Sequence, residues 1–374
     1  MGSVGVGRRF VAVVGMAGAL VAAGCGGALV SSTSGGSSDA GKAGEAGEAG
    51  QPEAGAGDPC GAVDTPGQAR TLVSGLDAPE GIAVDATRVY WIGGGGVMTV
   101  PRCGGAPSLL FSWGGPIQAF ALGPDRVYWV GFVPGSQGTT DGVVGWAPLA
   151  GGTAVALVTG QNDPWAVAVD GTSVYWVNAG DWGSADGTVM SQSNGTVMSM
   201  PLDGGAPTTL AAGQNFPDGI AVDATSVYWV DFGDYGLNDG AVMSIPIGQA
   251  ADPVMLASGQ PEASAIAVDA TRVYWSCING VAIAMVPLGG GTPETLGGWI
   301  GQALALDSTS VYWAGLSSIL KVPLDGGATT TLASGLIEPV AVAVDTYSVY
   351  WTDQGTCPGD GGACSGAVMK LNPK

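Results

Sequence analysis

The stretch AVDATSVYWVDFG, residues 221–233, contains a Val-Tyr-Trp triplet that occurs seven times in the 374-residue chain. The tryptophans of the seven copies are Trp91, Trp129, Trp176, Trp229, Trp275, Trp313 and Trp351. Successive copies lie 38, 47, 53, 46, 38 and 38 residues apart. A repeat of this length indicates an architecture in which each period forms one small structural unit.

Each period divides into four short apolar runs separated by turn residues. In the fourth period these runs are GIAVD, SVYWVD, GAVMSIPI and DPVMLASG, which is the pattern of a four-stranded antiparallel meander. An Asp ends the first run in six of the periods, and its position favours a turn-making role because such a side chain accepts backbone N–H groups ahead of it. The sequence therefore predicts an all-β fold, a seven-bladed β-propeller of four-stranded blades.

The seventh period lacks its fourth strand, because the chain ends at Pro373-Lys374 after the third. The segment ARTLVSGLDAPEGIAVD, residues 69–85, resembles TTTLASGLIEPVAVAVD, residues 329–345. Thr71 to Ser74 is thus an unpaired fourth strand at the start of the propeller. Pairing this N-terminal strand with the last blade would close the ring and remove both sheet edges.

One copy of the triplet carries a longer motif, Tyr350-Trp351-Thr352-Asp353, and Tyr228-Trp229-Val230-Asp231 matches it in part. These residues resemble the YWTD repeat of the low-density-lipoprotein-receptor class of propellers. The resemblance covers residues 70–374 and implies propeller architecture. Since that family implies six blades and this chain has seven periods, no binding residue is transferred from it.

The N-terminus predicts export and anchoring. Residues 1–24 resemble a lipoprotein signal peptide, in which LVAAGC, residues 20–25, would make Cys25 the lipidated residue; an ordinary signal peptidase cutting nearby is the alternative. Residues 25–59 are rich in Gly, Ala, Ser and Glu and predict a flexible tether, followed by the propeller at 60–374. We expect a cell-envelope lipoprotein at the outer membrane or cell surface, held in the membrane by its lipid only.

Composition excludes several functions. With 46% apolar and 11% charged residues and a net charge of −20, the chain can form a core but offers no basic surface for nucleic acid. It contains no histidine, which removes Ser-His triads and imidazole metal sites.

Of the cysteines, Cys357 and Cys364 share one loop, and Cys60 and Cys103 would meet on one rim, so two disulfides are predicted. Cys277 is left as a buried or a reactive thiol.

Insertions mark one face. Long loops between the second and third strands are predicted in blades two, three, four and seven, all on the face where blade-to-blade connections lie. Two of them match, NAGDWGSADG at 178–187 and DFGDYGLNDG at 231–240. Their carboxylates could hold Ca²⁺, and Trp182 and Tyr235 could stack on a sugar or peptide; the alternative is a pair of duplicated hairpins. The carboxylates are Asp181, Asp186, Asp231, Asp234 and Asp239.

A second candidate site is the mouth of the central channel, lined by the residue five before each strand-ending position. This ring consists of Glu80, Gln118, Trp165, Asp218, Ser264, Gln302 and Val340. Our leading hypothesis is a monomeric, non-enzymatic module that binds a peptide, glycan or envelope protein through the long-loop face. The alternatives are a metal-assisted hydrolase or lactonase using Glu80 and Asp218, and a mechanical spacer without a small ligand.

Overall fold

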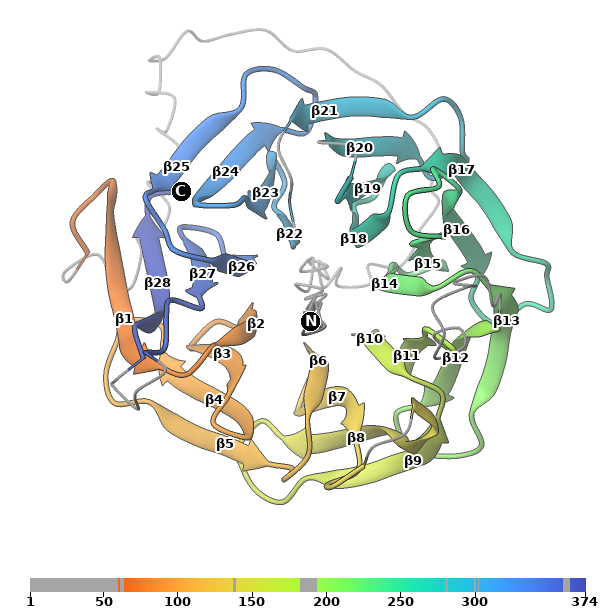
Figure 1. Cartoon of the computed structure of the whole chain (residues 1–374), viewed down its shortest axis with the longest axis horizontal. Coiled ribbons are helices and arrows are strands. Elements are labelled where there is room, and N and C mark those ends of the chain that lie inside the picture. Colours follow the sequence, from red (N-terminus) through yellow and green to blue (C-terminus); the bar gives the residue numbers. More distant parts are fainter. Residues whose placement is uncertain are drawn as a thin grey trace, which may run out of the picture.

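The computed structural model describes Cys60 and residues 64–136, 139–181, 194–279, 282–298, 301, 303–358 and 364–374. In these residues the chain forms 28 strands in seven four-stranded antiparallel sheets, together with one short 3-10 turn, η1 (Thr139–Asp141). Figure 1 shows the sheets arranged as blades around a central axis. The protein is a seven-bladed β-propeller, as the sequence predicts. No helix in the described ranges is long and apolar enough to cross a membrane.

The strands of each blade follow one another from the axis outward (Figure 1). Blade one contains β2 (Glu80–Val84), β3 (Arg88–Gly93), β4 (Gly96–Pro101) and β5 (Ser108–Ser112). Blade two contains β6 (Ile117–Leu122), β7 (Arg126–Phe132), β8 (Gly142–Pro148) and β9 (Val155–Gln161). Blade three contains β10 (Pro164–Val169), β11 (Ser173–Asn178), β12 (Gly195–Pro201) and β13 (Thr208–Gln214). Blade four contains β14 (Pro217–Val222), β15 (Ser226–Asp231), β16 (Gly240–Pro246) and β17 (Val254–Gln260). Blade five contains β18 (Ala263–Val268), β19 (Arg272–Cys277), β20 (Ala282–Pro287) and β21 (Glu294–Gly298). Blade six contains β22 (Leu304–Leu306), β23 (Ser310–Ala314), β24 (Ser318–Pro323) and β25 (Thr330–Ser334).

Blade seven joins the first and the last strands of the propeller. It contains β26 (Pro339–Val344), β27 (Val349–Asp353), β28 (Gly366–Asn372) and, on its outside, β1 (Gln68–Leu76). β1 pairs antiparallel with β28, with Arg70 opposite Lys370 and Ser74 opposite Ala367. The predicted closure is confirmed, and β1 extends beyond the four residues expected from the sequence on both sides.

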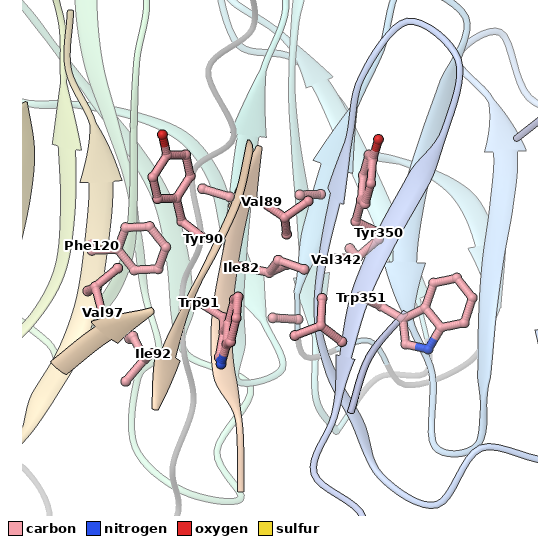
Figure 2. Packing of buried hydrophobic residues seen from close by; sticks show 14 of the residues in the cluster. Ile82, Val89, Tyr90, Trp91, Ile92, Val97, Phe120, Val342, Tyr350 and Trp351 are labelled. Atoms are coloured by element: carbon pink, nitrogen blue, oxygen red, sulfur yellow. The ribbon is translucent and has the colours of Figure 1, made fainter. Parts of the chain in front are cut away.

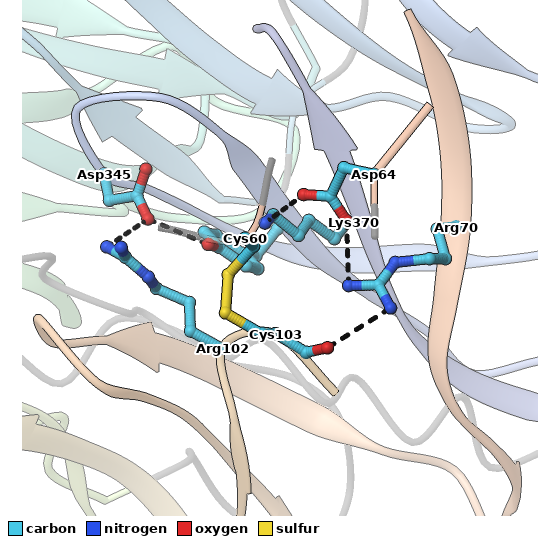
Figure 3. Close-up of a disulfide and its surroundings, with 8 residues drawn as sticks. Cys60, Asp64, Arg70, Arg102, Cys103, Asp345 and Lys370 are labelled. Atoms are coloured by element: carbon cyan, nitrogen blue, oxygen red, sulfur yellow. Dashed lines mark hydrogen bonds and ion pairs between the residues drawn. A yellow bond between two sulfur atoms is a disulfide. The ribbon is translucent and has the colours of Figure 1, made fainter. Parts of the chain in front are cut away.

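Covalent and ionic contacts hold this closure (Figure 3). The predicted disulfide between Cys60 and Cys103 is present and joins the segment before β1 to blade one. Asp64 lies between the cations of two paired strands: its carboxylate is 2.9 Å from the Arg70 guanidinium and also bonds the buried Lys370 ammonium. The Arg70 guanidinium donates to the carbonyl of Cys103 at 3.3 Å. Cys357 and Cys364 form the second predicted disulfide.

Because strand direction alternates within a blade, the ring has two distinct faces. The long-loop face carries the blade-to-blade connections and the loops between the second and third strands; the turn face carries the short turns that join the first to the second strand and the third to the fourth. The long loops are residues 133–141, 179–194, 232–239 and 354–365, in blades two, three, four and seven as predicted. Cys103 follows β4 on the turn face, so the disulfide attaches the N-terminal segment there.

The repeated triplet packs the blades against one another. All seven triplet tryptophans are fully buried, and Figure 2 shows Trp91 and Trp351 with their indole nitrogens directed away from the hydroxyl ends of Tyr90 and Tyr350. Ile82 of blade one lies beside Val342 of blade seven, at the junction of the two blades. Removing an aromatic side chain from such a core costs about 3–5 kcal/mol, so the triplet is a packing element.

The Asp that ends the first strand is a turn residue, as predicted. Asp85 Oδ1 accepts the N–H groups of Thr87 and Arg88 at 2.6 and 2.7 Å, and Asp85 Oδ2 accepts the Tyr90 hydroxyl at 2.7 Å. These hydrogen bonds outweigh the effect of burial and lower the pKa of Asp85. The tyrosine bond recurs in blades three to seven, between Tyr175 and Asp170, Tyr228 and Asp223, Tyr274 and Asp269, Tyr312 and Asp307, and Tyr350 and Asp345.

Candidate functional site

The loops of blades three and four close with the same device at their base. In blade four, Asp239 Oδ1 accepts the N–H of Asp234 at 2.8 Å. In blade three, Asn194 Oδ1 accepts the N–H of Asp181 at 3.0 Å, and its amide donates to Asp181 Oδ2 at 2.8 Å. The two loops are therefore structurally equivalent at their bases, although they differ in length.

A glycine with a left-handed backbone makes room for each of these closures. Gly180 and Gly233 have φ values of 90° and 80°, and a Cβ on either would overlap the closing side chain. Blade seven repeats the device, since Ser365 Oγ accepts the N–H of Thr356 at 2.8 Å beside Gly355. Three of the four long loops thus have fixed bases from which their tips project.

Glu262 fixes the blade-four loop to its neighbour. Its Oε1 accepts the N–H of Gly236 at 3.1 Å and the side-chain amide of Asn279 at 3.2 Å, and Glu262 itself belongs to the connection into blade five. The loop tip beyond it exposes Tyr235 by 55% and Leu237 by 58%. Tyr235 is thus exposed at the loop tip, while its predicted counterpart Trp182 lies outside the described residues.

Several oxygens near the bases of these two loops accept no hydrogen bond from any described residue. They are the Oδ1 atoms of Asn162, Asn178, Asn215, Asp231 and Asp234, each with almost no exposed surface. Asn178 and Asp231 occupy equivalent last positions in β11 and β15 and are only 6% and 7% exposed. Asn162 and Asn215 are equivalent residues in the connections to blades three and four, where their carbonyls accept from Gly180 and Gly233.

Asp231 is the most perturbed carboxyl of this group. Burial raises its pKa to about 7, opposed by a hydrogen bond from the Asn215 backbone. A buried carboxyl with a raised pKa at a loop base is a feature of functional sites.

The predicted calcium ligands do not gather into one set in the described part of the chain. Among described residues, only Asp77, Cys357 and Cys364 bring three potential ligand atoms within 4.8 Å of one another, and those cysteines are in a disulfide. Asp181, Asp231, Asp234 and Asp239 do not form such a group. Asp186 lies outside the described residues, so the calcium hypothesis itself stays a prediction.

At the channel mouth, the ring positions are more buried than a solvated rim would be. Glu80 and Asp218 are 7% and 8% exposed, on blades one and four, whereas Gln118 and Trp165 are partly exposed. Gln302 lies outside the described residues. Residues just before the inner strands have left-handed backbones in four blades, a conformation disfavoured for side chains other than glycine. These are Ala78, Asp163, Phe216 and Glu262, with φ values of 41° to 57°.

Cys277 occupies the position in blade five that Asp231 occupies in blade four. The thiol is buried and unbridged, and burial raises its pKa to about 11. A protonated, inaccessible thiol is a poor nucleophile, which favours the structural interpretation over the reactive one.

No protein-family model matches the chain, and no curated protein matches it in sequence. Among solved structures, the computationally designed protein Ika8 is similar over 80% of this chain and 98% of its own, with a TM-score of 0.54 and 14% identity. A chain of a nidogen/laminin complex is similar over 64% of this chain and 90% of its own, with a TM-score of 0.50 and 16% identity. At such identities the likeness shows the propeller fold alone.

A gluconolactonase from Xanthomonas campestris also resembles this chain, over 66% of this chain and 86% of its own, with a TM-score of 0.47 and 16% identity. Its similarity is too low to transfer an activity. Binding proteins and enzymes both occur on propellers, so the function has to be inferred from the site.

Proposed function

We propose that the chain is an envelope-anchored binding module that recognises a peptide, glycan or envelope protein through its long-loop face. The observation that carries the proposal is the asymmetry of the ring. All four long loops project from one face, and three of them have bases fixed by a repeated side-chain closure. A rigid scaffold that presents loops in this way is the usual arrangement of a recognition surface.

The attachment point agrees with this use. The Cys60–Cys103 disulfide holds the start of the propeller on the turn face, opposite the long loops. If residues before Cys60 anchor the chain by lipid on Cys25, the tether pulls on the turn face and leaves the long-loop face open to a partner. The anchor and the tether lie outside the described residues.

The test replaces residues 232–239 with the two glycines that join β3 to β4 in blade one, Gly94 and Gly95, which have left-handed backbones. We expect this variant to fold, because blade one shows that the same strands can be joined by two residues. It should lose photo-crosslinking to envelope proteins from a probe placed at the exposed position 358 in the blade-seven loop. Crosslinks that persist at wild-type yield would contradict a binding role for the blade-four loop.

One observation favours a second function, carboxylate-based hydrolysis at the channel mouth. Glu80 and Asp218 are buried carboxyls at equivalent positions on blades one and four, which face each other across the axis in Figure 1. Burial is how proteins tune a carboxyl for acid–base work. The Glu80→Gln and Asp218→Asn variants should each abolish turnover of a lactone panel if this function exists; unchanged turnover removes these residues from it.

A further inference from the structure

The charges of the propeller are segregated between its two faces. The structure describes eight basic residues, and all of them lie in the turn-face half of their strands or in the turns there: Arg70, Arg88, Arg102, Arg126, Arg272, Lys321, Lys370 and Lys374. The long-loop half contains twelve described acidic residues and none of the described basic ones: Asp77, Glu80, Asp141, Asp163, Asp181, Asp218, Asp231, Asp234, Asp239, Glu262, Glu338 and Asp353.

The turn face balances most of its own charge. It carries twelve described acidic residues beside the eight basic ones. The five recorded ion pairs all lie in this half: Arg70–Asp64, Lys370–Asp64, Arg102–Asp345, Arg126–Asp125 and Lys374–Asp307. The long-loop half has no described cation to pair with, so its negative potential extends into solvent and attracts cations.

An acidic face alone defines no site, but the unpartnered oxygens locate one on it. Asn178 and Asp231 are more than nine-tenths buried at the loop ends of neighbouring blades, and the Oδ1 of each has no donor among the described residues. Asn162, Asn215 and Asp234 add further acceptors at the same two loop bases. Buried acceptors without donors are costly, and a ligand that brings N–H groups would satisfy them.

We propose that the long-loop face binds a cationic polypeptide segment, with lysine or arginine side chains of the partner donating to the loop bases of blades three and four. This inference rests on the proposed binding function and specifies its ligand. A membrane surface or nucleic acid is repelled by the same potential, because both are anionic. Ammonium and guanidinium groups are donors without acceptor capacity, which matches a site whose unpartnered buried atoms are all oxygens.

The loop tip of blade four suits the apolar part of such side chains. Tyr235 and Leu237 are exposed beside Asp234 and Asp239 on the same loop. The aliphatic stems of lysine and arginine pack on such surfaces while their charged ends reach carboxylates, and a tyrosine ring also attracts a cation over its face.

The experiment measures binding of fluorescein-labelled octalysine to the full chain in mild detergent by fluorescence anisotropy, at low ionic strength and at about 1 M salt, where the screening length falls to about 3 Å. The test variant is Asp231→Asn with Asp234→Asn; blade three already has asparagine at the position of Asp231, which favours folding. The control is Asp203→Asn with Asp325→Asn, which removes two carboxylates from exposed turns of the turn face.

We expect octalysine to bind the wild-type chain, with affinity lost at high salt. The test variant should bind at least about tenfold more weakly, because a buried carboxylate facing a cation contributes strongly, while the control variant should change by less than about twofold. Equal weakening by both variants would show attraction to net charge without a site and would overturn the proposal. So would the absence of binding at low ionic strength.

A second measurement tests the proposal on the wild-type chain, in case the Asp231→Asn, Asp234→Asn variant misfolds. Octalysine carrying a photo-crosslinker should label wild-type residues 231–240 and leave the turn face unlabelled; labelling spread over both faces would overturn the proposal. The outcome is separable from the wider binding function. If octalysine fails to bind while envelope proteins still crosslink at position 358, the face binds a partner that is not cationic.

Discussion

At the scale of single residues, the propeller shows how one repeat position takes different roles. Asp353 and Asp231 both end the second strand of a blade. Asp353 accepts the N–H groups of Ile337, Glu338 and Gly355 at 3.0 to 3.2 Å, so both oxygens of this buried carboxylate have hydrogen-bond donors. Asp231 accepts a hydrogen bond from the Asn215 backbone, but its Oδ1 has no donor among the described residues. Phe216 before β14 has a left-handed backbone, whereas Glu338 before β26 does not. The two carboxylates therefore differ in how completely they are hydrogen-bonded.

Asp231 should make stability depend on pH. Its pKa is raised in the folded state to about 7, against 3.8 for the ordinary group, so the folded protein holds a proton that the unfolded chain releases. The resulting stabilisation is complete below about pH 4 and is lost as the pH rises through 7, with a slope of at most about 1.4 kcal/mol per pH unit. Urea unfolding of Asp231→Asn should lack this slope and gain stability over wild type at pH 8. Parallel curves for the two proteins would refute the assignment.

The buried tryptophans give a second residue-level test. Trp229 donates its indole N–H to Gln214 Oε1 at 3.0 Å. The indole N–H of Trp351 has no acceptor among the described residues, and Leu336 occupies the position in blade seven that Gln214 occupies in blade four. Gln214→Leu should therefore fold but lose about 1–3 kcal/mol, the cost of a buried donor left without a partner. Thermal and urea unfolding measure it, with the exposed Thr208→Val in the same blade as control. Equal stability would indicate that the donor finds another acceptor.

At the scale of elements, the loop bases show where sequence reasoning ends. The pairing of the two loops could be predicted from their matching DG-rich sequences, but that match aligned Asp186 with Asp239. The structure instead closes the blade-three loop with Asn194, because closure depends on which residue precedes the third strand, and β12 begins at Gly195. Strand boundaries inside a long loop carry no periodic signal. The left-handed backbone of Phe216 is equally absent from the sequence pattern.

Gly233→Ala tests the closure of the blade-four loop. A Cβ at this left-handed position would meet Asp239 Oδ1 and the backbone of Gly240, so the alanine should release the loop base and the first residue of β16. Hydrogen exchange should become faster in residues 232–240 and stay unchanged in β15 and in the rest of β16. Gly236→Ala is the control, because its backbone is also left-handed but a Cβ there meets nothing. Similar exchange changes in both variants would point to backbone strain as the cause in place of the lost closure.

At the scale of the whole molecule, the sequence carried the architecture almost completely. Seven buried Val-Tyr-Trp triplets, the short blade spacing and the displaced fourth strand are all repeat properties, and repeats are visible in one sequence. The strand order also places every described basic residue toward one face, but only the structure shows which carboxylates are paired there. The network at the closure, where Asp64 meets Arg70 and Lys370, joins residues more than 300 positions apart and has no sequence signal.

Ring closure should govern the stability of the whole propeller. The Cys60–Cys103 disulfide closes a segment of 43 residues and holds the chain that leads into β1, the strand on which blade seven depends. The Cys60→Ser, Cys103→Ser double variant should lose about 2–4 kcal/mol of unfolding free energy, because the unfolded chain regains the freedom that the cross-link removed. Differential scanning calorimetry under oxidising conditions measures the loss. The Cys357→Ser, Cys364→Ser variant is the control: its loop spans 7 residues within one connection, so its smaller loss should leave the ring transition in place. If both variants lost the same stability, the ionic contacts of Asp64 and the pairing of β1 with β28 would suffice for closure.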